Sequence, residues 1–203
     1  MFENVFKMYS SQLRKSILDL IGNRLPRTKH PLYYNYIICN GTKLTELLGQ
    51  FRKCSIVSEE VKTFHLHKFR EDCLYAGKGI NRRMFSHAID GKKIKHNIII
   101  TEVDAKYREI IKVWKNGEGL AVIRLFAETN HYEALSRENA LIKALGLKNL
   151  TNKINGTSYG VMRNGWNETE IINFGNMMLF NTLKMAVQDP SQVIMEADIV
   201  LSK

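Results

Sequence analysis

One short stretch of the chain combines residues that could bind and cleave a phosphate ester. Tyr75 is followed by a glycine–lysine–glycine segment, residues 77–79, and then by Arg83 and His87. The glycines predict a tight turn with free backbone amides, and Asn81 is predicted to cap a helix that begins there. Because Arg83 and His87 are four residues apart, they share a face of that helix. A phenol, free amides and a cationic helix face with an imidazole together indicate a phosphate-binding site.

A carboxylate lies where a later helix would otherwise be apolar. The helix predicted over residues 131–145 has an inward stripe that includes Ala134 and Leu141, and Glu138 falls between them. Burying a carboxylate is costly unless it is paired, protonated or bound to a metal. One interpretation is an ion pair with a buried arginine. The other, which we favour, is a metal-binding or acid–base carboxylate at the rim of a cleft.

Three strands and several helices must position these side chains. Runs of aromatic and branched residues predict strands over residues 32–39, 72–76 and 120–127. Helical periodicity predicts helices over residues 2–22, 42–53, 58–71, 103–115, 131–145 and 168–187, besides the helix near Asn81. The predicted fold class is α/β of the α+β type. It has a small, three-stranded, mostly antiparallel sheet flanked by helices, with helical N- and C-terminal extensions.

The predicted organisation has three parts. Residues 1–31 form an amphipathic helix and a basic linker, residues 32–162 form the central domain, and residues 163–203 form a helical extension packed on it. The N-terminal helix could lie on a membrane surface. Packing of its apolar stripe against the domain is the favoured use.

Composition restricts the classes of partner. The chain has 203 residues and a formal net charge of +10, which favours nucleic acid first and an anionic membrane surface second. Cys39, Cys54 and Cys73 lack metal-ligand spacing, which predicts reduced thiols in an intracellular compartment, cytoplasm or nucleus. Neither a transmembrane segment nor a signal peptide is predicted, so we expect no membrane partner.

Taken together, these motifs resemble those of the GIY-YIG nuclease superfamily. Tyr36-Ile-Ile-Cys-Asn40 resembles the first half of the family motif, and Tyr75-Ala-Gly77 resembles the second half. The family's helical arginine, helical histidine, metal-binding glutamate and following asparagine are matched by Arg83, His87, Glu138 and Asn152.

Within the superfamily the chain is most similar to the ankyrin-repeat and LEM-domain endonucleases of animals. The segments that carry this similarity are Tyr75–His87, Arg137-Glu138-Asn139, Leu150-Thr151-Asn152 and Gly156–Gly160. The resemblance covers residues 32–162, and the chain contains neither ankyrin repeats nor a LEM domain.

The resemblance implies metal-dependent hydrolysis of DNA phosphodiester bonds, with a preference for branched or distorted duplex. Glu138 would hold Mg²⁺, for which Mn²⁺ can substitute, and no small-molecule cofactor is expected. Arg83 would offset negative charge that develops on the phosphate oxygens. The side chains expected to contact the DNA backbone are Lys78, Arg82, Lys92 and Lys93.

The identity of the general base stays open between two residues. Tyr36 could act as base only if nearby cations favour its phenolate. His87 is the alternative, because an unperturbed imidazole titrates near neutral pH. Tyr75 would orient the water or the phosphate, and Asn152 would buttress the site.

Two other functions are compatible with the sequence. One is a non-catalytic nucleic-acid-binding domain of the same fold, which would bind in a salt-sensitive way without cutting. The other is a nuclease that cleaves RNA. Oligomeric state has no indication in the sequence.

Overall fold

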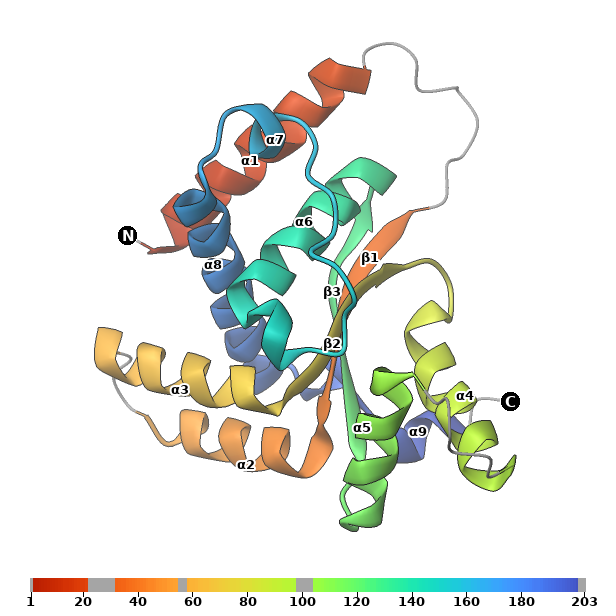
Figure 1. The fold of residues 1–203 in the computed structure, drawn as a ribbon. Coiled ribbons are helices and arrows are strands. Elements are labelled where there is room, and N and C mark those ends of the chain that lie inside the picture. Colours follow the sequence, from red (N-terminus) through yellow and green to blue (C-terminus); the bar gives the residue numbers. More distant parts are fainter. Residues whose placement is uncertain (1, 22–31, 55–57, 98–103, 201–203) are drawn as a thin grey trace.

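The computed structural model describes residues 2–21, 32–54, 58–97 and 104–200 (Figure 1). The basic linker predicted before residue 32 lies outside these described residues. Among them, no helix is both long and apolar enough to cross a membrane.

In the described part of the chain, helices surround a small sheet (Figure 1). The strands are β1 (Tyr33–Asn40), β2 (Cys73–Gly79), β3 (Leu120–Thr129) and β4 (Val193–Met195). The helices are α1 (Phe2–Ile21), α2 (Gly41–Arg52), α3 (Glu59–Asp72), α4 (Arg83–Asn97), α5 (Ala105–Lys115), α6 (His131–Leu145), α7 (Val161–Asn164), α8 (Glu168–Gln188) and α9 (Glu196–Val200).

The sheet is antiparallel with strand order β2-β1-β3-β4, so β1 lies inside it and β2 forms one edge. The predicted fold class is confirmed, but the expected count of three strands was too low. The short β4 pairs with residues 121–123 of β3 and covers that strand's outer edge. The sequence did not predict β4 because three residues are too few to show an alternating pattern. Pairing with β3 stabilises their extended conformation.

Side-chain alternation along β1 explains why the sheet is covered on both faces. Ile37 and Cys39 point into a core that includes residues of α6 and α8, whereas Tyr36 and Ile38 point into a second core with residues of α4 and α5. Both faces are thus dry, which accounts for the unbroken apolar run that predicted this strand.

The N-terminal helix packs on the domain, as we favoured. Leu13 and Ile17 of α1 are fully buried, and the ring of Phe6 stacks on that of Phe174 in α8 with centroids 5.9 Å apart. Since α8 belongs to the same core as β1, residues 168–188 help to form the interior that supports the sheet. The boundaries at residues 31 and 162 stay a prediction.

Two local expectations around residues 77–83 were wrong. Gly77 and Gly79 belong to β2, opposite Tyr36 and Tyr34 of β1, instead of forming a tight turn. Asn81 has a φ of 51°, so it cannot adopt the extended backbone of an N-cap, and α4 begins at Arg83. The chain reverses in residues 80–82 because the β1 pairing continues to the second glycine.

Close packing of α6 against α8 generates a prediction about stability. A Cβ atom at Gly175 would lie 2.1 Å from the backbone oxygen of Ala140, whereas a Cβ atom at Gly49 would meet nothing within 4 Å. Gly175→Ala should therefore lower the free energy of unfolding by about 1–3 kcal/mol or more. Gly49→Ala, inside α2, should raise it by about 0.5–1 kcal/mol. Urea denaturation measures both, and equal effects would contradict the packing described.

Candidate active site

Two tyrosines lie side by side because of the register between β1 and β2. Gly77 pairs with Tyr36, and Tyr75 pairs with Ile38 one step along the same face. The two phenol rings have centroids 6.0 Å apart. A Cβ atom at Gly77 would lie 2.9 Å from the Tyr36 hydroxyl and 2.7 Å from the Tyr75 ring. The glycine therefore provides the space in which the two rings meet.

An imidazole from α4 completes this group. His87 is 2% exposed. Its Nε2 lies 2.9 Å from the Tyr36 hydroxyl, and its ring meets the Tyr75 ring edge-on with centroids 4.8 Å apart. The buried Tyr36 and His87 thus form one cluster with the half-buried Tyr75, called here the tyrosine–histidine cluster.

The electrostatics of this cluster set the protonation states of the imidazole and the phenol. Burial, together with the positive charges of Lys106 and Arg83, lowers the pKa of His87 to about 3. Burial also raises the pKa of Tyr36, and the neighbouring Tyr75 adds to that effect. At neutral pH the imidazole is therefore uncharged and the phenol protonated. The direction of the hydrogen bond between them depends on the imidazole tautomer: the Tyr36 hydroxyl donates when the ring proton is on Nδ1, and His87 donates when it is on Nε2.

A further tyrosine, which the sequence analysis did not single out, holds α4 in place. The Tyr34 hydroxyl donates to the backbone oxygen of Asn81 at 2.8 Å and accepts from the backbone amide of Met84 at 3.2 Å. This bridge ties β1 to the first turn of α4. The orientation of Arg83 and His87 depends on it.

Glu138 does not make the ion pair that was one of its two interpretations. The buried arginine of α6 is Arg137, which binds Glu133 with Nη2 and Oε1 2.9 Å apart. Among the described residues, Glu138 has no cation within 4.0 Å of its carboxylate, whose Oε1 accepts from the backbone amide of Lys78 at 3.2 Å. Burial raises the pKa of Glu138, and the positive charge of Lys78 opposes that shift.

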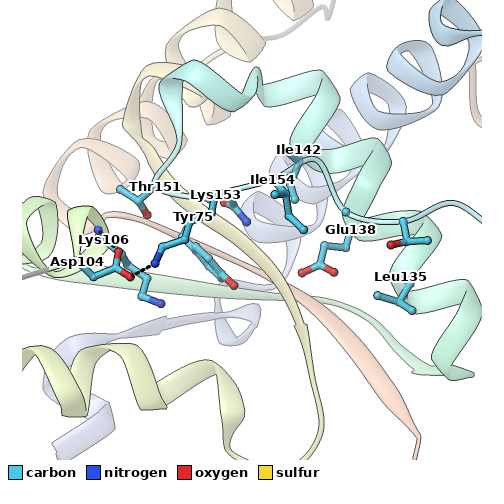
Figure 2. A pocket seen from close by; sticks show the side chains of 12 residues that line it. Tyr75, Asp104, Lys106, Leu135, Glu138, Ile142, Thr151, Lys153 and Ile154 are labelled. Carbon is cyan, nitrogen blue, oxygen red and sulfur yellow. Dashed lines mark hydrogen bonds and ion pairs between the residues drawn. The ribbon is translucent and has the colours of Figure 1, made fainter.

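Glu138 lies at a cleft of about 420 Å³ along the outer edge of β2. Tyr75 and Asn152 also line it, together with the start of α5, one face of α6 and the loop of residues 151–157. Figure 2 shows the Tyr75 ring between Glu138 on one side and Lys106 on the other. The cleft brings a carboxylate, a phenol and an ammonium group together.

Polar groups occupy the backbone of β2 along this edge. Asn152 accepts from the amide of Ala76 at 3.1 Å and donates to its carbonyl at 2.7 Å, and Thr151 binds the carbonyl of Leu74. The Lys78 amide, expected to be free for a phosphate, is taken by Glu138. Asn152 thus stands where a buttressing residue would, and the edge strand is protected from pairing with another chain.

Of the six residues predicted to be catalytic, three line the cleft and three lie next to it. Tyr75, Glu138 and Asn152 are in its wall. Tyr36 and His87 contact Tyr75 from the interior. Arg83 is exposed, and its charge opposes the rise that burial causes in the pKa of both tyrosines of the cluster. The catalytic roles of these six residues stay predictions, whereas their proximity in the fold is as expected.

The four lysines and arginines expected to bind DNA have different surroundings. Lys78 has its Nζ 4.7 Å from the centre of the Tyr33 ring, and Arg82 lies over Phe85. Lys92 is bound to Glu196 of α9 with Nζ and Oε1 2.9 Å apart, and Lys93 lies 3.9 Å from Asp90. A DNA-binding role for Lys92 would require exchange of that carboxylate for a phosphate.

Sequence reasoning missed the start of α5 as part of the site. Asp104 and Lys106 line the cleft, and Lys153 in the opposite loop pairs with Asp104 at 3.0 Å. Asp104 caps α5 by accepting from the Lys106 amide. That N-cap was the available signal, but nothing in the sequence indicated that this helix begins beside β2.

The site can hold a metal ion through one protein ligand. Among the described residues, no three His, Cys, Asp or Glu side chains cluster as a ligand set. The Glu138 carboxylate keeps one oxygen, Oε2, without a hydrogen-bond partner among them. Mg²⁺ commonly retains several waters and needs one or two carboxylates plus substrate phosphates. The donor set therefore fits Mg²⁺ bound jointly by Glu138, water and a phosphate oxygen.

Comparison with known proteins agrees with the geometry. The family model described as the LEM-3-like GIY-YIG domain matches residues 33–201. The chain is similar to Ankyrin repeat and LEM domain-containing protein 1 of Homo sapiens, with 27% identity over 66% of this chain. The Mus musculus protein of that name is 34% identical over 48% of the chain, and the Caenorhabditis elegans homolog is 28% identical over 64%. No solved structure matches the chain.

The matched regions are about a fifth of the relatives' own length, 22%, 18% and 19% respectively. The family match nevertheless covers nearly all of this chain, and it includes β4 as well as the cleft and the tyrosine–histidine cluster. The chain therefore belongs to the LEM-3-like GIY-YIG domain family, a branch of the GIY-YIG nuclease superfamily.

Proposed function

We propose that this domain is a metal-dependent DNA endonuclease that prefers branched or distorted duplex. The observation that carries the proposal is the hydrogen bond between Tyr36 and a neutral His87, beside a cleft whose carboxylate, Glu138, lacks an ion-pair partner among the described residues. Proton acceptor, phenol and hard oxygen ligand are the groups that hydrolysis of a phosphodiester needs.

In this proposal Tyr36 and His87 act as one base. The step uses the His87 tautomer whose ring proton is on Nδ1. The attacking water gives a proton to the Tyr36 oxygen while the Tyr36 hydroxyl gives its own proton to Nε2 of His87, over the 2.9 Å that separates these two atoms. The hydroxide formed attacks phosphorus, and the leaving oxygen takes a proton from solvent. A neutral imidazole is required, and burial keeps His87 in that form. The same burial weakens His87 as a proton acceptor, so the negative charge of the bound phosphate would have to favour the imidazolium that forms.

The other residues would orient the water and the phosphate and stabilise negative charge. The Tyr75 hydroxyl, in the cleft wall, would orient the water or phosphate, and Arg83 would offset charge on the phosphate oxygens. Mg²⁺ or Mn²⁺ at Glu138 would supply stabilisation of the negative charge on the leaving oxygen. Asn152 would keep β2, and with it Tyr75, in register with the cleft.

Support for DNA as substrate comes from the charge of +10 and from membership of a nuclease superfamily. The basic residues near the cleft would bind backbone phosphates, which position a duplex without reading its sequence. Selection would then depend on the shape of the DNA. An intracellular compartment remains a prediction, supported by the free cysteines Cys39, Cys54 and Cys73.

Cleavage assays test the proposal directly. The protein should cut end-labelled DNA with Mg²⁺ but not with EDTA, and flaps or four-way junctions faster than linear duplex. Glu138→Gln should abolish cutting with DNA binding and thermal stability retained, because Glu138 pairs with no arginine. The contrasting variant, Glu133→Gln, should lose about 3–5 kcal/mol of stability, because it leaves the buried Arg137 unpaired.

Results of these assays separate the competing functions. Binding without cutting of any DNA would favour the non-catalytic domain, and cutting of RNA in preference to DNA would favour the RNA nuclease. Loss of folding in Glu138→Gln would show that the carboxylate is structural and would contradict its proposed role.

The shared base generates a prediction about double substitution. Tyr36→Phe and His87→Ala should each lower kcat by about 10²–10⁴-fold. The double variant should be no slower than the slower single variant, because either change interrupts the same proton path. Tyr132→Phe, at an exposed tyrosine, is the control and should keep the wild-type rate. Multiplicative losses in single-turnover measurements would contradict a shared path.

A further inference from the structure

Lys106 is a cation in the wall of the cleft, on the opposite side of Tyr75 from Glu138 (Figure 2). It belongs to the first turn of α5 and is half-buried. Its Nζ lies 5.1 Å from the centroid of the Tyr75 ring and 5.1 Å from that of Tyr107. The ammonium group is thus held against two phenol rings within the wall of the candidate active site.

The nearest carboxylate is bound to another lysine. Asp104 accepts from the backbone amide of Lys106 with Oδ1 and pairs through Oδ2 with Nζ of Lys153, 3.0 Å away. Within the part of the chain that the structure describes, Lys106 has no carboxylate within 4.0 Å. Asp104 and Asp90 act on Lys106 at longer range and favour its charge, whereas Arg83 and Lys153 disfavour it.

A half-buried ammonium without a paired anion is unfavourable, and contact with aromatic rings offsets only part of the cost. Burial accordingly lowers the pKa of Lys106. An anion in the cleft would remove this imbalance. The cleft lies along the edge of β2, and the proposed function makes a phosphate of the nucleic-acid backbone the anion expected there.

We infer that Lys106 binds a non-bridging oxygen of a DNA phosphate in the cleft. The inference rests on the proposed function and adds a second anchor to it. With a cation at one side of Tyr75 and the metal-binding carboxylate at the other, a DNA strand crosses the Tyr75 hydroxyl in one orientation. Lys106 then contacts substrate and is a phosphate-binding residue of the reaction, separate from Arg83 on α4.

A salt series tests this contact without any cutting. Each phosphate contact contributes about 0.9 to the slope of log K against log salt concentration for duplex DNA. In EDTA, Lys106→Gln should reduce that slope by about 0.9 and weaken binding, as measured by fluorescence anisotropy. Lys106→Arg should keep the wild-type slope. Lys115→Gln, at an exposed lysine in the last turn of the same helix, should change nothing.

Cleavage by the same variants adds a second readout. Lys106→Gln should lower kcat/KM by about 10–100-fold, and Lys106→Arg should recover most of the loss. An unchanged salt slope in Lys106→Gln would overturn the inference, even if cutting or melting temperature falls, because a packing role predicts that pattern. Absence of cutting by the wild type would overturn the proposed nuclease activity instead, while the binding slope would still decide the role of Lys106.

Discussion

The hydrogen bond between the Tyr36 hydroxyl and Nε2 of His87 is the contact on which the proposed chemistry depends. It joins β1 to α4, two elements that are 51 residues apart at this point. Its geometry requires Gly77 opposite Tyr36, where any side chain would displace a ring. It also requires the Tyr34 bridge, which fixes the start of α4 on the same strand. Burial then keeps the phenol protonated and the imidazole neutral.

Helix α6 carries charged residues with two different roles, one structural and one proposed to be functional. Glu133 and Arg137 form a buried pair that the exposed Arg14 of α1 joins from outside, so α6 and α1 are tied together. One residue further along, Glu138 turns instead to the edge of β2 and to the cleft. Desolvation offsets much of what a buried pair gains, but removing either partner would leave an uncompensated buried charge. Glu138 is only partly buried, and its Oε2 is available to a ligand. The Glu133–Arg137 pair, in contrast, has a structural role in the helix.

The sequence predicted those parts of the molecule that depend on local patterns. Alternation and helical periodicity indicated three strands and the main helices, and matched motifs indicated that six distant residues would meet. Gly77 and Gly79 were misread because glycine serves turns by its backbone freedom and crowded strands by its lack of a side chain, and only the partner strand distinguishes the two uses. Lys106 was missed for a similar reason: its importance comes from where α5 begins relative to β2.

The most direct test of the account is the protonation state of His87 in the folded protein. Long-range proton–nitrogen NMR correlation of the imidazole, assigned with a His87→Gln variant, can follow the ring between pH 7.5 and 5. We expect a neutral ring throughout, because burial lowers its pKa to about 3. The shared base further predicts that Nε2 is unprotonated and accepts from Tyr36. A ring that titrates near pH 6.5, the value of an exposed histidine, would contradict the buried hydrogen bond and the shared base built on it.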